Sequence, residues 1–154
     1  MPYYIAAKIE RERNQNRENQ CKSGARSYAL RTLVEGGLAI DPLSHHPLST
    51  SPLERGKAGK YIYAVRNDTM RVGPDGDRSK KDVVKHETLF RNLPVQAAGE
   101  IRFHEGAVID INDLSGTYLT EDEMEEEEFR RVVAESLREA GVALSQDVRR
   151  RIRV

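Results

Sequence analysis

The sequence predicts one α+β domain, in which a short N-terminal helix and a C-terminal amphipathic helix flank a central, mostly antiparallel sheet. Apolar runs rich in β-forming residues cluster between residues 60 and 111, and the clearest helical periodicity lies after them. The 154 residues, 38% of them hydrophobic, fit a single domain with a modest core. We therefore expect residues 1–154 to form one domain, with a polar N-terminal segment over 1–22 and a basic tail over 146–154.

The N-terminal third carries the weakest signals. Apolar residues between Tyr28 and Val34 predict a short helix, which Gly36-Gly37 would end. Prolines and serines between Asp41 and Pro52 then predict a loop.

The strands are easier to place. Tyr61–Val65 is a continuous apolar run, which is typical of a central strand buried on both faces. Asn67-Asp68 forms a turn signal before a second strand over Met70–Val72. Glu100–Phe103 and Ala107–Ile111 predict a further hairpin.

The last helix has start, face and stop signals. Thr120 with Glu123 has the form of a capping box, and Gly141 stands where a helix ends. One face is formed by Phe129, Val132, Val133, Ser136, Leu137 and Ala140. We expect this face to pack against the sheet.

Charge and composition narrow the function classes. Lys+Arg and Asp+Glu both count 25, so no net field favours nucleic acid or membrane. Every residue from Glu121 to Glu128 except Met124 is acidic, which we interpret as a solvated helix face. The arginines after Gln146 are interpreted as a disordered end, and without interleaved aromatics they disfavour nucleic acid as a partner. No apolar run is long enough to span a membrane, so we expect a cytoplasmic protein without a membrane partner.

Residues that could carry chemistry form no recognisable spacing. Cys21 is the single cysteine, which excludes an internal disulfide and a zinc site built on several thiolates. The four histidines include no helical pair at i and i+4, so we expect no metal site. Neither a nucleophile elbow nor a phosphate-binding glycine loop is present.

Three motifs in order resemble a known family. They are Lys85-His86-Glu87-Thr88-Leu89-Phe90, then Ala97-Ala98-Gly99-Glu100, then Ser115-Gly116-Thr117-Tyr118. Their order is similar to the C-terminal region of plant IQ-motif calmodulin-binding proteins and their bacterial relatives, over residues 59 to 145. The third motif typically reads Ser-Gly-His-Tyr in that family, and Thr117 stands here in the place of its histidine. The resemblance implies no chemistry and is compatible with a non-catalytic protein-interaction module.

A second resemblance implies an enzyme. Ser49-Thr50-Ser51 followed by Tyr61-Ile62-Tyr63 is similar to elements of pertussis- and cholera-like ADP-ribosyltransferase toxins. It implies an ADP-ribosyltransferase-like fold and NAD as substrate. It also implies a bacterial toxin or effector transferase that modifies a macromolecular acceptor or hydrolyses NAD. Such a protein would be cytoplasmic or delivered into the cytoplasm of a target cell, with an immunity or regulatory protein as a further partner.

That resemblance also assigns catalytic roles. Its alignment puts His86 at the position of the catalytic glutamate, with Glu87 beside it. A carboxylate would stabilise the oxocarbenium-like transition state, which an imidazolium would oppose. Either Glu87 or Glu100 therefore substitutes for the glutamate, or the fold is kept without this activity.

The same resemblance assigns the cofactor contacts. Arg26 would clamp the pyrophosphate, the Ser49-Thr50-Ser51 hydroxyls would brace the site, and Tyr61 and Tyr63 would flank the nicotinamide. Each has a simpler interpretation, because serines in a proline-rich loop serve turns and tyrosines on strands commonly build the core.

Overall fold

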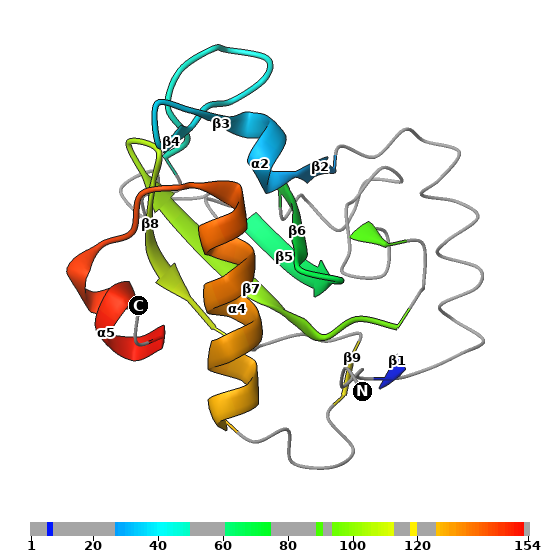
Figure 1. Ribbon diagram of the computed structural model, residues 1–154. Helices are drawn as coiled ribbons and strands as arrows, with labels where there is room; N and C mark the ends of the chain where they lie inside the picture. The colour runs from blue at the N-terminus through cyan, green and yellow to red at the C-terminus, as the bar shows by residue number, and fades with distance from the viewer. Residues whose placement is uncertain are drawn as a thin grey trace, which may run out of the picture.

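A five-stranded sheet forms the centre of the protein, with strands in the order β2-β6-β5-β7-β8 and every neighbouring pair antiparallel (Figure 1). The structure is a computed structural model. It describes residues 6–7, 27–49, 61–74, 89–90, 94–112, 118–119 and 126–152. The predicted class, a small α+β domain with a mostly antiparallel sheet, is confirmed.

The strands follow the predicted runs closely. They are β2 (Tyr28–Ala29), β5 (Tyr61–Arg66), β6 (Thr69–Pro74), β7 (Ala97–His104) and β8 (Ala107–Ile111). β5 lies between β6 and β7 and is buried on both faces, as its continuous apolar run predicts. Asn67 and Asp68 both have positive φ, at 51° and 62°. This turn geometry matches the right-handed twist of the hairpin strands.

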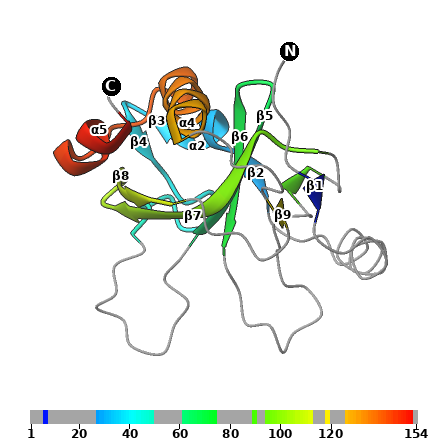
Figure 2. The ribbon, with the colours of Figure 1, turned by 90° about the horizontal axis from the view of Figure 1, so that it is seen from below.

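Helices cover one face of the sheet, as Figure 2 shows. They are α2 (Leu30–Leu33), α4 (Glu126–Ala140) and α5 (Gln146–Ile152). The predicted apolar face of α4 is confirmed, since Val132, Val133 and Leu137 are buried. Ser136 is also buried, and its hydroxyl donates to the carbonyl of Val133 at 2.8 Å. α4 ends at Ala140, and Gly141 follows it with a φ of +73°, which is typical of the residue after a helix.

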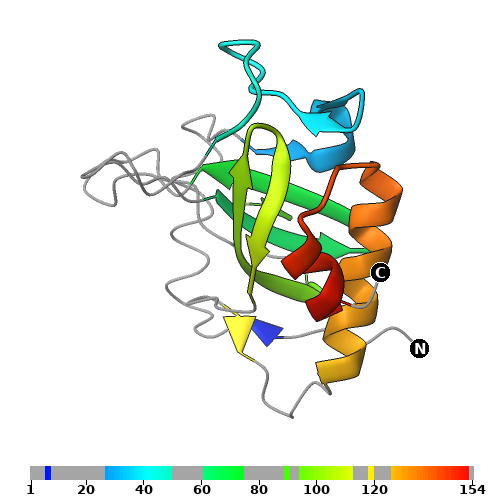
Figure 3. The same cartoon turned by 90° about the vertical axis from the view of Figure 1, so that its left-hand side faces the viewer.

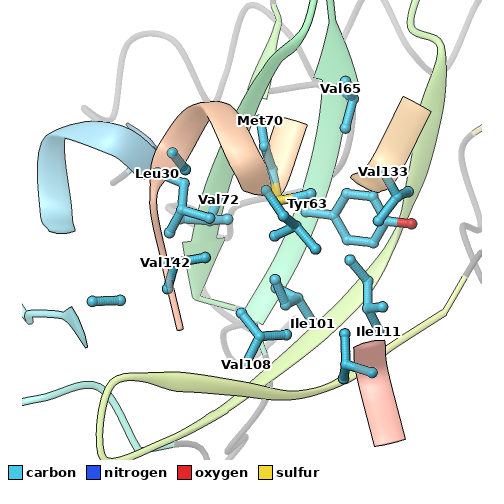
Figure 4. Close-up of a cluster of buried hydrophobic side chains, with 14 of the residues drawn as sticks. Leu30, Tyr63, Val65, Met70, Val72, Ile101, Val108, Ile111, Val133 and Val142 are labelled. Carbon is cyan, nitrogen blue, oxygen red and sulfur yellow. The ribbon is translucent and has the colours of Figure 1, made fainter. Parts of the chain in front are cut away.

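Two apolar clusters lie on opposite faces of the sheet. The larger one fills the space between the sheet and α4, with Tyr63, Ile101 and Val133 among its members (Figure 4). The smaller one lies on the other face and contains Ile62, Ala64, Leu89, Val95 and Ala98. Alternate residues of β5 therefore enter different clusters, because successive side chains of a strand point to opposite faces.

The prediction for Gly36-Gly37 was wrong. α2 ends at Leu33, and the chain then forms a hairpin of β3 (Val34–Glu35) and β4 (Leu38–Ala39). Gly36 and Gly37 are its turn, at φ +59° and +83°. Glycines adopt positive φ easily, so they form a two-residue hairpin turn here instead of ending a helix.

The prediction of a disordered basic tail was also wrong for the part that the structure describes. Residues 146–152 form α5, which buries Val148 and Ile152 in the main core. Just before it, the amide of Ser145 donates to the Val108 carbonyl, and the Val108 amide donates to Ala143. Two apolar side chains four residues apart supply one buried face of a helix, even among several arginines.

A short strand pair completes the described fold. β1 (Ala6–Ala7), within the polar N-terminal segment, pairs antiparallel with β9 (Tyr118–Leu119). The proposed capping box at Thr120 and Glu123 lies outside the described residues. Across the described ranges, no helix is both long and apolar enough to cross a membrane.

Candidate functional site

Only part of the predicted NAD site falls within the described structure. Glu100, Ser49, Tyr61 and Tyr63 are described. The remaining predicted site residues lie outside the described ranges, namely Arg26, Thr50, Ser51, His86 and Glu87. The four described residues can therefore be compared with the roles that the resemblance implies.

The two tyrosines face the main core. Tyr63 is 0% exposed, and its hydroxyl donates to the Asn112 carbonyl at 2.6 Å. The Tyr61 ring packs edge-on against Phe103, with centroids 5.7 Å apart and an interplanar angle of 83°. Tyr63 thus presents no surface to a nicotinamide, which corrects its predicted role. Its large apolar ring contributes to the core instead.

Glu100 lies on the other face of the sheet. Its cross-strand partner is Ile62, which belongs to the smaller cluster, and directly opposed residues share a face. The Asn112 side-chain amide donates to the Glu100 carboxylate at 3.1 Å, and the Glu100 amide donates to the Asn112 side-chain oxygen at 2.9 Å. Asn112 thereby orients a partly buried carboxylate. The sheet separates this carboxylate from Tyr61 and Tyr63.

Ser49 lies at the far end of β7 from Glu100. Its hydroxyl accepts a hydrogen bond from the Glu105 amide, at 2.9 Å, in the β7–β8 turn. Four residues of strand separate Glu100 from His104, which corresponds to about 13 Å at 3.3 Å per residue. The structure therefore does not bring Ser49, Glu100 and the tyrosines into one site.

A different feature stands out on the surface, the loop from Asp41 to Pro47, here called the Leu43 loop. It follows β4 and projects beyond the sheet in Figures 1 and 3. Leu43 is 64% exposed and is one of two large hydrophobic residues, with Leu38 at 36%, that are exposed in the described ranges. Single exposed hydrophobic residues are common on protein surfaces. Leu43 becomes a candidate contact for another molecule through the way its loop is held.

Asp41 organises the Leu43 loop from within. Its carboxylate accepts a hydrogen bond from the Leu43 amide at 2.8 Å, an Asx-type turn. The Asp41 carbonyl accepts from the His45 amide at 2.9 Å, and the Asp41 amide donates to the His46 carbonyl at 2.8 Å. His45 adopts φ 61°, a left-handed conformation that L-residues rarely take and that these bonds stabilise. The loop is therefore held in one shape.

The base of the Leu43 loop is tied to the sheet. Leu48 is buried, and its amide donates to the Ala39 carbonyl at 2.8 Å. Gly106, in the β7–β8 turn, donates its amide to the Leu48 carbonyl and accepts from the Ala39 amide, both at 2.9 Å. These bonds connect the loop to the strands that carry the core, so Leu43 is presented from a rigid support.

The sequence predicted a loop here but did not single out Leu43. The signal that was present is an aspartate followed by proline, leucine and serine, because Asp in such a position accepts backbone amides two and three residues on. What the pattern could not supply is the direction in which the leucine points, since that depends on the supporting β7–β8 turn.

Neither a metal site nor a known relative points to a function for the Leu43 loop. Among the described ranges, no three His, Cys, Asp or Glu side chains group closely enough to hold a metal ion. The chain matches no protein-family model, no curated protein and no solved structure.

Proposed function

We propose that the protein is a non-catalytic protein-interaction module that contacts its partner through the Leu43 loop. The observation that carries this proposal is a 64% exposed leucine on a loop braced by its own backbone and by Asp41. The alternative enzyme site draws less support, because the sheet separates Glu100 from the two tyrosines.

The energetics favour a preformed contact of this kind. A loop already held in its bound shape loses less conformational entropy on association. Full burial of one leucine side chain in a partner's apolar pocket contributes about 1.5–3 kcal/mol. The partner implied is a protein with a concave apolar pocket that accepts a branched aliphatic side chain.

A photo-crosslinking amino acid placed at position 43, in cells of the source organism, tests this proposal. We expect a discrete covalent adduct with one protein, and no such adduct from the same group at Arg138, which is exposed on α4. Excess unlabelled wild-type protein should compete the adduct away. Excess Leu43→Asp protein should not, although its melting temperature should match wild type because surface substitutions rarely shift stability by more than about 0.5 kcal/mol.

Two outcomes oppose the proposal. One is an identical adduct pattern from positions 43 and 138, which would indicate random collision instead of recognition. The other is equal competition by wild-type and Leu43→Asp protein, which would remove Leu43 from the contact.

The oriented carboxylate of Glu100 favours a second candidate function. In this candidate the protein is an ADP-ribosyltransferase-like, NAD-using bacterial effector, or an NAD glycohydrolase, that acts in the cytoplasm of a target cell. Asn112 holds the Glu100 carboxylate, and a fixed carboxylate stabilises an oxocarbenium-like transition state better than a mobile one. His86, Glu87 and Arg26 would complete the site from outside the described ranges.

Nicotinamide release from NAD tests the second candidate. Glu100→Gln keeps a side-chain oxygen near Asn112 while removing the charge, so it should abolish release with little change in melting temperature. If millimolar NAD produces no nicotinamide release and no rise in melting temperature, the second candidate is ruled out and only the interaction module remains.

A further inference from the structure

The outer face of α5 carries arginines without described partners. Val148 and Ile152 are buried, so the opposite side of this short helix faces solvent. Arg149 and Arg150 are exposed, and in the described part of the chain no carboxylate pairs with either. Arg151 differs, because it pairs with Asp110 of β8 at 2.5 Å. Arg149 and Arg150 are therefore available to an anionic partner.

The first turn of α4 carries the opposite charge. Its first three residues are Glu126, Glu127 and Glu128. Glu128 is engaged by Arg131 within the helix. Glu127 is exposed, and within the described ranges no cation pairs with it. The positive end of the helix dipole lies here, but it offsets only about half an elementary charge.

α5 and the first turn of α4 lie on the same side of the molecule but apart from each other. Figures 1 and 3 both show α5 beside the middle of α4, with the first turn of α4 extending past it. An α-helix of 15 residues is about 22 Å long, so the acidic turn and α5 are separate along α4. In a dimer with two-fold symmetry, each contact between the copies occurs twice. The arginines of each copy can therefore face the glutamates of the other copy.

The overall charge does not oppose such an association. Lys+Arg and Asp+Glu both count 25, so two copies experience no net repulsion and local charge patches dominate their approach. Arginine suits the contact because its planar guanidinium can bind a carboxylate with two parallel hydrogen bonds.

We propose that two copies of this chain associate through α5 of one copy and the first turn of α4 of the other, each arginine surface facing the other copy's glutamates. The partner that this surface recognises is therefore a second copy of the protein. The association is separate from the Leu43 loop, which projects at another end of the molecule (Figure 3).

Sedimentation velocity on the full chain tests the proposal by charge reversal. Wild-type protein should dimerise at about 0.05 M salt and dissociate at about 1 M salt, where the Debye length falls to about 3 Å. The double variant Arg149→Glu with Arg150→Glu should be monomeric at low salt, as should Glu126→Lys with Glu127→Lys. An equimolar mixture of these two double variants should again form dimers, because each restores the complement of the other. Arg138→Glu, an exposed arginine of α4 outside both surfaces, should leave the dissociation constant within about threefold of wild type.

The design separates the proposal from a loss of folding. At about 1 M salt, where wild type should also be monomeric, each variant's melting curve should match wild type. Unfolded chains could not form the dimers expected in the mixture. A wild-type protein that is monomeric at low salt overturns the proposal. So does a dimer that high salt leaves intact, or a mixture of the two double variants that stays monomeric.

Discussion

Gly106 joins the sheet to the Leu43 loop, and its replacement by alanine tests how rigid that junction is. The residue lies in the β7–β8 turn at φ +86°. Its amide and carbonyl bind Leu48 and Ala39, which lie on either side of the loop. A side chain at this position would therefore disturb the loop base directly.

The surroundings of Gly106 determine how much Gly106→Ala should destabilise the protein. A Cβ at position 106 would lie 2.7 Å from the Leu38 Cβ and 3.2 Å from both the nitrogen and the oxygen of Ala39. The backbone conformation costs an L-residue about 1–2 kcal/mol, and overpacking adds about 1–3 kcal/mol. We expect Gly106→Ala to lower the free energy of unfolding by about 2–5 kcal/mol.

Gly36→Ala is the matched control. Gly36 has φ +59°, and a Cβ there would meet nothing within 4 Å. Gly36→Ala should lower the free energy of unfolding only by the cost of the backbone conformation, about 1–2 kcal/mol. Urea denaturation of both variants measures the difference, which we expect to be about 1–3 kcal/mol.

Equal losses in the two variants would refute the reasoning. They would mean that β4 moves away from the new methyl group at no cost, so the β7–β8 turn would not brace the Leu43 loop. If the bracing is real, Gly106→Ala should also reduce the yield of crosslinking from position 43, whereas Gly36→Ala should not.

Three further substitutions test the packing, each by urea denaturation. Tyr63→Phe keeps the ring but removes the hydroxyl that donates to Asn112, and should cost about 0.5–1.5 kcal/mol; no loss would mean that water replaces this bond. Ile152→Ala should cost about 2–5 kcal/mol if α5 belongs to the core, and almost nothing if residues 146–152 behave as a tail. Asp68→Gly should stabilise the β5–β6 hairpin by up to about 1 kcal/mol, because glycine adopts φ 62° without strain; a destabilised variant would contradict that account of the turn.

Local patterns in the sequence determined the elements that build the domain. The uninterrupted apolar run of β5 predicted a strand buried on both faces, and the helical spacing from Phe129 to Ala140 predicted the face of α4 that packs on the sheet. Asn67-Asp68 predicted the turn between β5 and β6. Each of these signals lies within one segment, where periodicity and turn chemistry act between near neighbours.

Only the tertiary structure decided which residues share a surface. Tyr63 and Glu100 face opposite sides of the sheet because of the register between β5 and β7, and a shift of one residue would reverse a strand's faces. α5 became a helix because the core accepts Val148 and Ile152, although its arginines resemble a solvated tail. Leu43 is exposed on a loop whose base is bonded to Gly106, a residue distant from it in the sequence. These outcomes depend on contacts between residues far apart in the chain, which local periodicity does not encode.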